Sequence, residues 1–371
     1  MMKQTRLLSF LLLICLLLSF SSCFKQNANS SSSTTDSIET NIGQNDGLVV
    51  HYLDVGQGDS IFIELPNGEC MLIDASVSKY KSFIADSIKR YGYEQIDYVV
   101  ATHSHADHIG GMTYILDTFE IGCIYLPDAS AATQTYITMA ETIIENDIKA
   151  VIAQAGEVVI DEQELKAVFL APFEIDENDQ NKNSAVLYLS YGETSFLFMG
   201  DADIEIEQQI GKVDCDVLKV GHHGSRTASD SDFLEYASPM YAIISCGEGN
   251  SYGHPHQEAV DRLNACGAQI LRTDLLGTIT IHSDGKDLTV AYGKEDIELD
   301  NVEESIEDEE IISSDTQSPK WILNTSSKKV HRTDCKHVMD ISEKNKKESF
   351  ASLQELFEEG YTACGTCKPQ E

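Results

Sequence analysis

One stretch decides how this chain of 371 residues is interpreted: Thr102-His103-Ser104-His105-Ala106-Asp107-His108-Ile109-Gly110-Gly111. It places three imidazoles and a carboxylate within six residues, directly after the apolar stretch Tyr98 to Ala101, which predicts a buried strand. Imidazole and carboxylate groups together suit Zn²⁺, Mn²⁺ or Fe²⁺. Because alternate residues can converge on one side, we expect His103 and His105 to bind one metal ion. Asp107 and His108 then face a second ion close by.

Outward from this stretch, short apolar runs alternate with amphipathic ones between residues 47 and 294. Turns rich in glycine separate the first strands, and a hairpin is expected around Gly192-Glu193. The last part, from Gln269 to Tyr292, predicts a β-meander. Two sheets packed face to face with helices outside would bury these strands. Strands are predicted at 48–54, 60–65, 69–74, 186–191, 194–199, 216–220 and 241–245, and helices at 79–91, 133–146, near 204 and at 257–266.

The HxHxDH pattern is the signature of the metallo-β-lactamase fold, and residues 47–293 resemble that superfamily. The resemblance implies a mixed α/β (α+β) domain, a four-layer αββα sandwich. In the family, one Asp supports the metal loop, one carboxylate bridges two metals and a late His is the last ligand. The matching stretches here are Leu72-Ile73-Asp74-Ala75, Phe198-Met199-Gly200-Asp201 and Val217-Leu218-Lys219-Val220-Gly221-His222-His223-Gly224-Ser225.

The resemblance also assigns metal ligands. The first ion would be bound by His103, His105 and Asp201. The second would be bound by Asp107, His108, Asp201 and His223, with His222 or His254 as alternatives to His223. Most members have a third His for the first ion, but this sequence has no histidine between residues 109 and 200, and Asn181-Lys182-Asn183-Ser184 falls near the expected place. Two divalent ions are therefore expected, either Zn²⁺ or an exchangeable Mn²⁺.

A narrower resemblance is to the exported soluble domain of the ComEC competence proteins, which is thought to be a metal-dependent nuclease. The channel helices of those proteins are missing here, so DNA transport itself is not implied. The resemblance is carried by Asp54-Val55-Gly56-Gln57-Gly58-Asp59-Ser60, His222-His223-Gly224-Ser225, Asn250-Ser251-Tyr252-Gly253-His254-Pro255-His256 and Arg272-Thr273-Asp274-Leu275-Leu276-Gly277.

These ligands predict a hydrolase that uses a metal-bound hydroxide, since a divalent cation lowers the pKa of bound water to about 7. Asp107, His222 and His254 are the catalytic candidates, and His254 would protonate the leaving group unless it is a ligand. Three basic residues are either phosphate contacts or surface charges: Lys182, Lys219 and Arg226.

The charge limits the substrate. The chain has 61 acidic and 26 basic residues and a net charge of −35, which repels duplex DNA and anionic lipid. We therefore expect a phosphodiesterase or nuclease acting on a small phosphodiester, a cell-wall polymer or DNA presented by a partner. The alternatives are a lactonase or other acyl hydrolase, and a non-catalytic surface protein that binds DNA or cell wall.

Three segments outside the central domain concern targeting and linkage. Residues 1–22 resemble a signal peptide, and Phe20-Ser21-Ser22-Cys23 resembles a lipobox that would place a lipid on Cys23. The protein is then exported to the outer face of the cell membrane and held there only by this anchor, or is secreted. Residues 23–46 predict a flexible tether, and residues 295–318, with eleven acidic and no basic residues, an acidic linker.

Residues 319–371 form a further predicted domain. His331 and Cys335 are followed by Cys364 and Cys367, and such a set can surround one structural Zn²⁺ tetrahedrally. A disulfide between Cys364 and Cys367 is the alternative. The arrangement resembles the small zinc-binding domain of the Ada DNA-repair protein, but His331 stands where that domain has its first cysteine, so methyl transfer is not implied. A strand is expected at 321–324 and a helix at 350–359.

Overall fold

A computed structural model describes residues 47–294 and, in the C-terminal part, 321–332, 335–338, 341–349, 356 and 361–368. Four predicted features lie outside the described residues: the signal peptide at 1–22, the lipid site Cys23, the tether at 23–46 and the linker at 295–318. Most of the helix predicted at 350–359 does so too. Among the described residues, none of the helices combines the length and apolar character that a membrane span requires.

The first sheet has eight strands in the order β15-β14-β1-β2-β3-β4-β5-β6. Strands β1 to β3 pair antiparallel, and β3 to β6 pair parallel. The strands are β1 (Leu48–Tyr52), β2 (Ile61–Glu64), β3 (Cys70–Ile73), β4 (Gln95–Val100), β5 (Glu120–Leu126), β6 (Ala150–Ile152), β14 (Thr278–Ser283) and β15 (Leu288–Gly293).

The second sheet has seven strands in the order β13-β12-β11-β10-β9-β8-β7. The predicted hairpin is confirmed as β9 and β10, which pair antiparallel, while β10 to β13 pair parallel. The strands are β7 (Val158–Asp161), β8 (Leu165–Ala171), β9 (Val186–Tyr191), β10 (Thr194–Phe198), β11 (Val217–Lys219), β12 (Tyr241–Ile244) and β13 (Gln269–Arg272).

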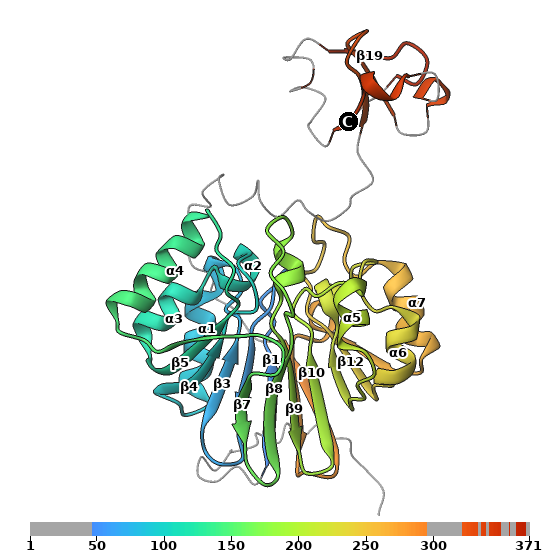
Figure 1. The fold of residues 1–371 in the computed structure, drawn as a ribbon. Coiled ribbons are helices and arrows are strands. Elements are labelled where there is room, and N and C mark those ends of the chain that lie inside the picture. The colour runs from blue at the N-terminus through green and yellow to red at the C-terminus, as the bar shows by residue number, and fades with distance from the viewer. Residues whose placement is uncertain are drawn as a thin grey trace, which may run out of the picture. The chain divides into compact units, whose positions relative to one another are not determined.

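Helices cover both outer faces, so the four-layer αββα sandwich is confirmed. Figure 1 shows α1, α3 and α4 against the first sheet and α5, α6 and α7 against the second, with the two sheets between them. The helices are α1 (Lys81–Arg90), α2 (Ala106–Ile109), α3 (Met112–Thr118), α4 (Gln134–Glu145), α5 (Ile204–Ile210), α6 (Ser231–Ala237), α7 (Gln257–Ala265) and α8 (Thr273–Leu276).

Three buried apolar layers follow from the alternation of side chains along the strands. Between the sheets, Val50 and Ile63 of one meet Phe169 and Phe196 of the other. The opposite face of the first sheet packs against α1, α3 and α4, and that of the second against α5, α6 and α7. Central strands such as β1 and β10 are therefore buried on both faces.

The predicted meander from Gln269 to Tyr292 is wrong. β13 pairs parallel with β12 in the second sheet, whereas β14 and β15 form a hairpin in the first. Helix α8 carries the chain between the sheets. A meander would need antiparallel pairing of β13 with β14, but α7 returns the chain so that β13 runs beside β12 in the same direction.

The described C-terminal residues form a separate small sheet in the order β18-β16-β17-β19. The predicted strand at 321–324 is confirmed as β16. A compact apolar cluster includes Trp321, Val330 and Leu356. The strands are β16 (Trp321–Asn324), β17 (Lys329–His331), β18 (Lys346–Ser349) and β19 (Thr362–Ala363).

Candidate metal centres

The histidine-rich loop follows β4 and is held by a buried carboxylate at the end of β3. Asp74 accepts hydrogen bonds from the Thr102 backbone N–H at 2.8 Å and the Thr102 hydroxyl at 2.7 Å. It also accepts one from His108 Nδ1 at 2.7 Å. This bond fixes the tautomer of His108 and leaves Nε2 with its lone pair. Asp74 therefore supports the loop as the family resemblance implied.

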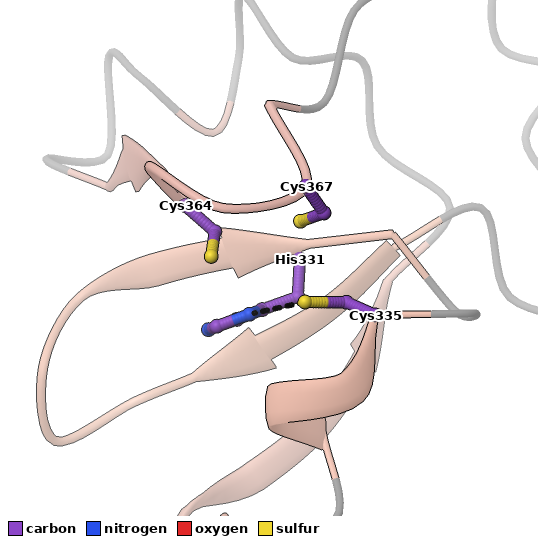
Figure 2. Close-up of side chains that lie close together, drawn as sticks. All are labelled: His331, Cys335, Cys364 and Cys367. Atoms are coloured by element: carbon purple, nitrogen blue, oxygen red, sulfur yellow. Dashed lines mark hydrogen bonds between the residues drawn. The ribbon is translucent and has the colours of Figure 1, made fainter.

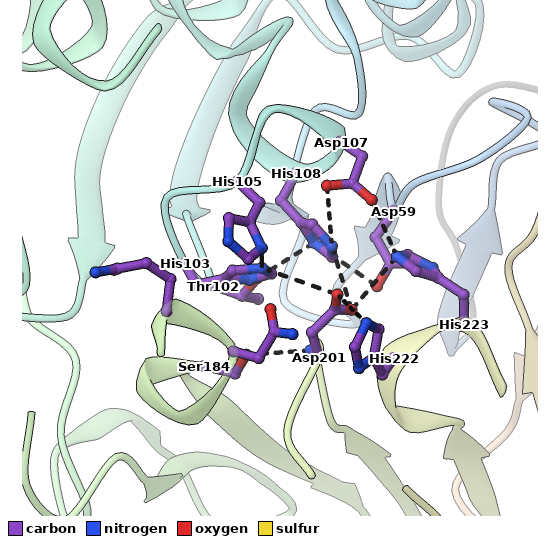
Figure 3. A network of polar contacts seen from close by, with 12 residues as sticks. Asp59, Thr102, His103, His105, Asp107, His108, Ser184, Asp201, His222 and His223 are labelled. Atoms are coloured by element: carbon purple, nitrogen blue, oxygen red, sulfur yellow. Dashed lines mark hydrogen bonds and ion pairs between the residues drawn. The ribbon is translucent and has the colours of Figure 1, made fainter. Parts of the chain in front are cut away.

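The first ligand set consists of His103, His105 and Asp201, whose ligand atoms lie within 4.8 Å of one another. His103 Nε2 and His105 Nδ1 are 3.0 Å apart (Figure 3). His103 Nδ1 lies 3.1 Å from the hydroxyl oxygen of Thr102, and that hydroxyl donates a hydrogen bond to Asp74. Burial, together with the neighbouring His108 and His105, holds the pKa of His103 well below its usual value. This keeps the imidazole neutral, as metal binding requires.

The second set consists of Asp107, His108, Asp201 and His223, again within 4.8 Å. Asp201 Oδ1 lies 3.2 Å from His108 Nε2 and 3.4 Å from His223 Nε2. Its other oxygen, Oδ2, lies 3.9 Å from His103 Nε2. One carboxylate therefore faces both sets, as Figure 3 shows.

Asp201 reaches this position because the chain before it passes very close to the loop. Gly200 has a positive φ of 53°, and a Cβ placed there would lie 3.2 Å from the Cβ atoms of Ser184 and Thr102. A larger side chain would push β10 away from the histidines. The family motif thus needs glycine here for both conformation and space.

His222 and His223 lie in the 3₁₀ turn η3 (Gly221–Gly224), and both have left-handed backbones with φ of 49° and 51°. Such conformations cost free energy in non-glycine residues and are concentrated at functional sites. His223 Nδ1 donates to the Ser245 carbonyl at 3.0 Å, so Nε2 faces Asp107 and Asp201. Of the two histidines, only His223 belongs to the second set, and the sequence had left that choice open.

The chemistry of these atoms fits divalent cations. Four buried atoms that face the centre of the second set make no hydrogen bond to the described residues: Asp107 Oδ1, His108 Nε2, Asp201 Oδ1 and His223 Nε2. Burial lowers the pKa of His108, but Asp201, Asp74 and Asp107 outweigh it and raise the pKa well above its usual value. The carboxylates thus require positive charge at this position, which a metal ion supplies.

A cavity of about 290 Å³, its open mouth included, leads to both sets. His222 Nε2 lies 3.8 Å from Asp201 Oδ2, and the His254 ring lies 5.5 Å from that of His222 between their centres. Both candidate catalytic histidines are therefore at the cavity. The lining residues are Gln57, His105, Asp107, Asn181, Asp201, His222, His223, Tyr252 and His254.

Of these, Gln57 and Tyr252 were not singled out in the sequence. Both lie inside stretches that resemble the ComEC proteins, but that resemblance assigned no role to either residue. Asn181, from the segment that the sequence predicts near the position of the missing histidine, is among the lining residues.

The three basic residues are not placed as phosphate contacts. Lys219 is completely buried, and its ammonium group lies 2.7 Å from Asp59 Oδ2 and donates to the Val220 carbonyl at 3.0 Å, so a substrate contact is excluded. Lys182 pairs with Glu205. Arg226 is exposed and does not line the cavity. Lys219 instead neutralises Asp59, whose Oδ1 lies 3.4 Å from His223 Nδ1.

Replacing Lys219 by methionine is expected to lower the free energy of unfolding by about 3–5 kcal/mol, because the Asp59 carboxylate would stay buried without its partner. Urea unfolding of the metal-free protein, followed by far-ultraviolet circular dichroism, measures this. The double variant Asp59→Asn/Lys219→Met should recover part of the loss, and Lys286→Met, on the surface, should cost little. A Lys219→Met protein as stable as the wild type would contradict the role of the pair.

A separate ligand set lies in the C-terminal part. His331 ends β17, Cys335 follows it, and Cys364 and Cys367 lie in the turn after β19, with all four ligand atoms within 4.8 Å (Figure 2). The cysteines are free, so the alternative of a disulfide is not observed. Desolvation opposes ionisation of Cys364, but the backbone N–H groups of Cys367 and Thr366 lower its pKa to about 7. Three thiols and one imidazole suit a tetrahedral metal ion.

Comparison with known proteins agrees with this geometry. A sequence model described as the metallo-beta-lactamase superfamily matches residues 53–248. ComE operon protein 3 of Bacillus subtilis is 29% identical over 251 residues, which cover 62% of this chain and 32% of the relative. Competence protein ComA of Neisseria gonorrhoeae is 30% identical, covering 61% and 31%. Recombination protein 2 of Haemophilus influenzae is 28% identical, covering 63% and 28%. The chain thus spans about a third of the length of the curated relatives it matches.

Proposed function

The chain belongs to the metallo-β-lactamase superfamily, and on that premise we propose that it is a metal-dependent hydrolase that cleaves phosphodiesters. One observation carries the proposal: two adjacent ligand sets share Asp201, and both open into one cavity. Paired metal sites of this kind act on the attacking and the leaving oxygen of a displacement at phosphorus.

Divalent cations bound there supply Lewis acidity and activate water. The protein's own groups orient and transfer protons. Asp74 and the Ser245 carbonyl fix the tautomers of His108 and His223, so that both rings present Nε2 to the centre. His254 lies at the cavity beside His222, which supports a role for it in protonating the leaving group.

The cavity supports a substrate of low charge. Its lining contains no lysine or arginine, and Lys219, the nearest buried cation, is engaged with Asp59. A long polyanion would find no compensating charge there, whereas a small phosphodiester would need only the metal ions. The names of two relatives refer to competence and recombination, which supports a substrate derived from DNA or presented by a DNA-handling partner.

The test is hydrolysis by the purified chain with Mn²⁺ or Zn²⁺. It should cleave bis-p-nitrophenyl phosphate and a dinucleotide but not a lactone. His254→Gln should slow the dinucleotide by about 10²–10⁴-fold and the nitrophenyl ester far less, because nitrophenolate leaves without a proton. His282→Gln, on β14 and outside the cavity lining, is the matched control. Cleavage of the lactone alone would show an acyl hydrolase instead.

The ends of the chain carry two further proposals. We propose that His331, Cys335, Cys364 and Cys367, the HisCys₃ set, hold a structural Zn²⁺. We also propose that the protein is exported and anchored by a lipid on Cys23. Thiolate-rich sites favour zinc over harder ions, which supports the first. The second rests on the sequence of residues 1–23. Cys23→Ala should release the protein from the membrane fraction, and its retention there would refute the lipid anchor.

A further inference from the structure

The first ligand set has three protein ligands, which leaves at least one coordination position of a bound ion open. His103, His105 and Asp201 supply three ligand atoms, and the segment where a third histidine would stand forms the 3₁₀ turn η2 (Gln180–Asn183). Three hydrogen bonds tie this turn and the two residues after it to the site. Ala185 N–H donates to the Thr102 carbonyl at 2.9 Å, the Ser104 hydroxyl donates to Gln180 Oε1 at 3.0 Å, and Asp201 N–H donates to the Ser184 hydroxyl at 3.1 Å. Each bond joins the turn to a segment that carries a ligand of the first set.

Asn181 lies in this turn and is 5% exposed, and it lines the cavity together with His105 and Asp201. Its Oδ1 is buried and accepts no hydrogen bond from the described residues. Burying such an oxygen costs free energy of folding unless it accepts a hydrogen bond or binds a ligand. Asn183, two residues on, is fully buried and shows that the turn can satisfy an amide. Its Oδ1 accepts from Asp176 N–H at 2.8 Å and its Nδ2 donates to the Asp176 carbonyl at 2.9 Å.

We propose that Asn181 Oδ1 is the fourth protein ligand of the first metal ion. The first site then has two imidazole nitrogens and two oxygens, and the amide oxygen is a hard ligand. Hard oxygen ligands favour Mn²⁺ and Mg²⁺, whereas a third imidazole would favour Zn²⁺. Asn181 therefore makes the first site selective for a harder, exchangeable ion. This inference needs the metal pair but not a phosphodiester substrate, so a failed hydrolysis assay would leave it standing.

His222 is the competing ligand. Its Nε2 approaches Asp201 Oδ2 at 3.8 Å, but it does not belong to the set of His103, His105 and Asp201. Its Nδ1 lies 3.4 Å from the Thr227 hydroxyl. We therefore assign His222 to the cavity wall and not to the first ion.

Metal titration tests the proposal without an activity assay. The full chain is stripped of metal, and one equivalent of Zn²⁺ fills the thiolate set, which Mn²⁺ does not occupy. Free Mn²⁺ is then measured by electron paramagnetic resonance. Asn181→Leu keeps the branched shape of the side chain but removes the oxygen, so it should weaken the binding of one of the two Mn²⁺ ions at least about tenfold. Asn181→Asp, which keeps an oxygen, should bind both ions. Asn181→His should raise the preference of that site for Zn²⁺ over Mn²⁺ by about tenfold or more.

Each result decides the assignment. Two Mn²⁺ ions bound to Asn181→Leu with wild-type affinity would overturn it. So would loss of the first ion in His222→Ala together with its retention in Asn181→Leu. If Asn181→Leu does not fold, as judged by circular dichroism, the metal preference of Asn181→His decides alone, and an unchanged preference refutes the proposal.

Discussion

Replacing Asp201 by alanine is expected to slow hydrolysis by about a thousandfold or more and to lower the Mn²⁺ content of the large domain from two ions to fewer than one. Asp201 is the only residue that the first and the second ligand set share, so its loss weakens metal binding at both. Metal ions contribute several kcal/mol to transition-state stabilisation, and each 1.4 kcal/mol is about tenfold in rate. Steady-state kinetics and elemental analysis of the same preparation measure the two effects.

Asp203→Ala is the matched control. Asp203 lies two residues further on and caps α5, where its carboxylate accepts from the N–H groups of Glu205 and Ile206. Its removal should cost about 1 kcal/mol of stability and leave the metal content unchanged. An Asp201→Ala protein that still binds two ions and turns over at the wild-type rate would show that the shared carboxylate is not the bridge.

Removing the metal from the HisCys₃ set is expected to unfold the C-terminal domain, a loss on the order of 10 kcal/mol for a structural zinc site. Its described residues form two small apolar clusters, and one of them includes Trp321, the only tryptophan of the chain. Tryptophan fluorescence therefore reports on this domain alone, while circular dichroism is dominated by the larger one. Chelation or Cys364→Ser should shift the emission of Trp321 to longer wavelength.

Cys266→Ser provides the control, because Cys266 lies after α7 in the large domain and outside every ligand set found among the described residues. The Trp321 fluorescence of the Cys266→Ser protein should respond to chelation as that of the wild type does. If Cys364→Ser keeps a buried Trp321 and unfolds at the wild-type temperature, the metal is not what stabilises this domain.

The fold could be predicted from the sequence because short motifs carried the family resemblance, and the same motifs named the residues that the structure brings together in two sets. The HxHxDH loop, Asp201 after an apolar strand and His223 after another all stand at the carboxyl ends of strands, where a sandwich of this topology brings them together. In the same way, the CxxC pair and the spacing of His331 and Cys335 predicted the ligand set of the C-terminal part.

The predictions that failed concern features that depend on packing between distant parts of the chain. β13 has the pattern of any short strand, and only its parallel pairing with β12 puts it in the second sheet. Lys219 follows two apolar residues, and nothing in that pattern shows that Asp59, far away in the chain, neutralises it in the interior. The unsatisfied oxygen of Asn181 is likewise a property of its surroundings and not of the sequence around it.

Anomalous scattering from crystals of the chain grown with Mn²⁺ is the most direct test of the two-metal centre. We expect two peaks about 3.5–4 Å apart in the large domain, with the Asp201 carboxylate between them. His103 and His105 would contact one, and Asp107, His108 and His223 the other. A single peak, or peaks away from Asp201, would contradict the two-metal centre and with it the hydrolase proposed here.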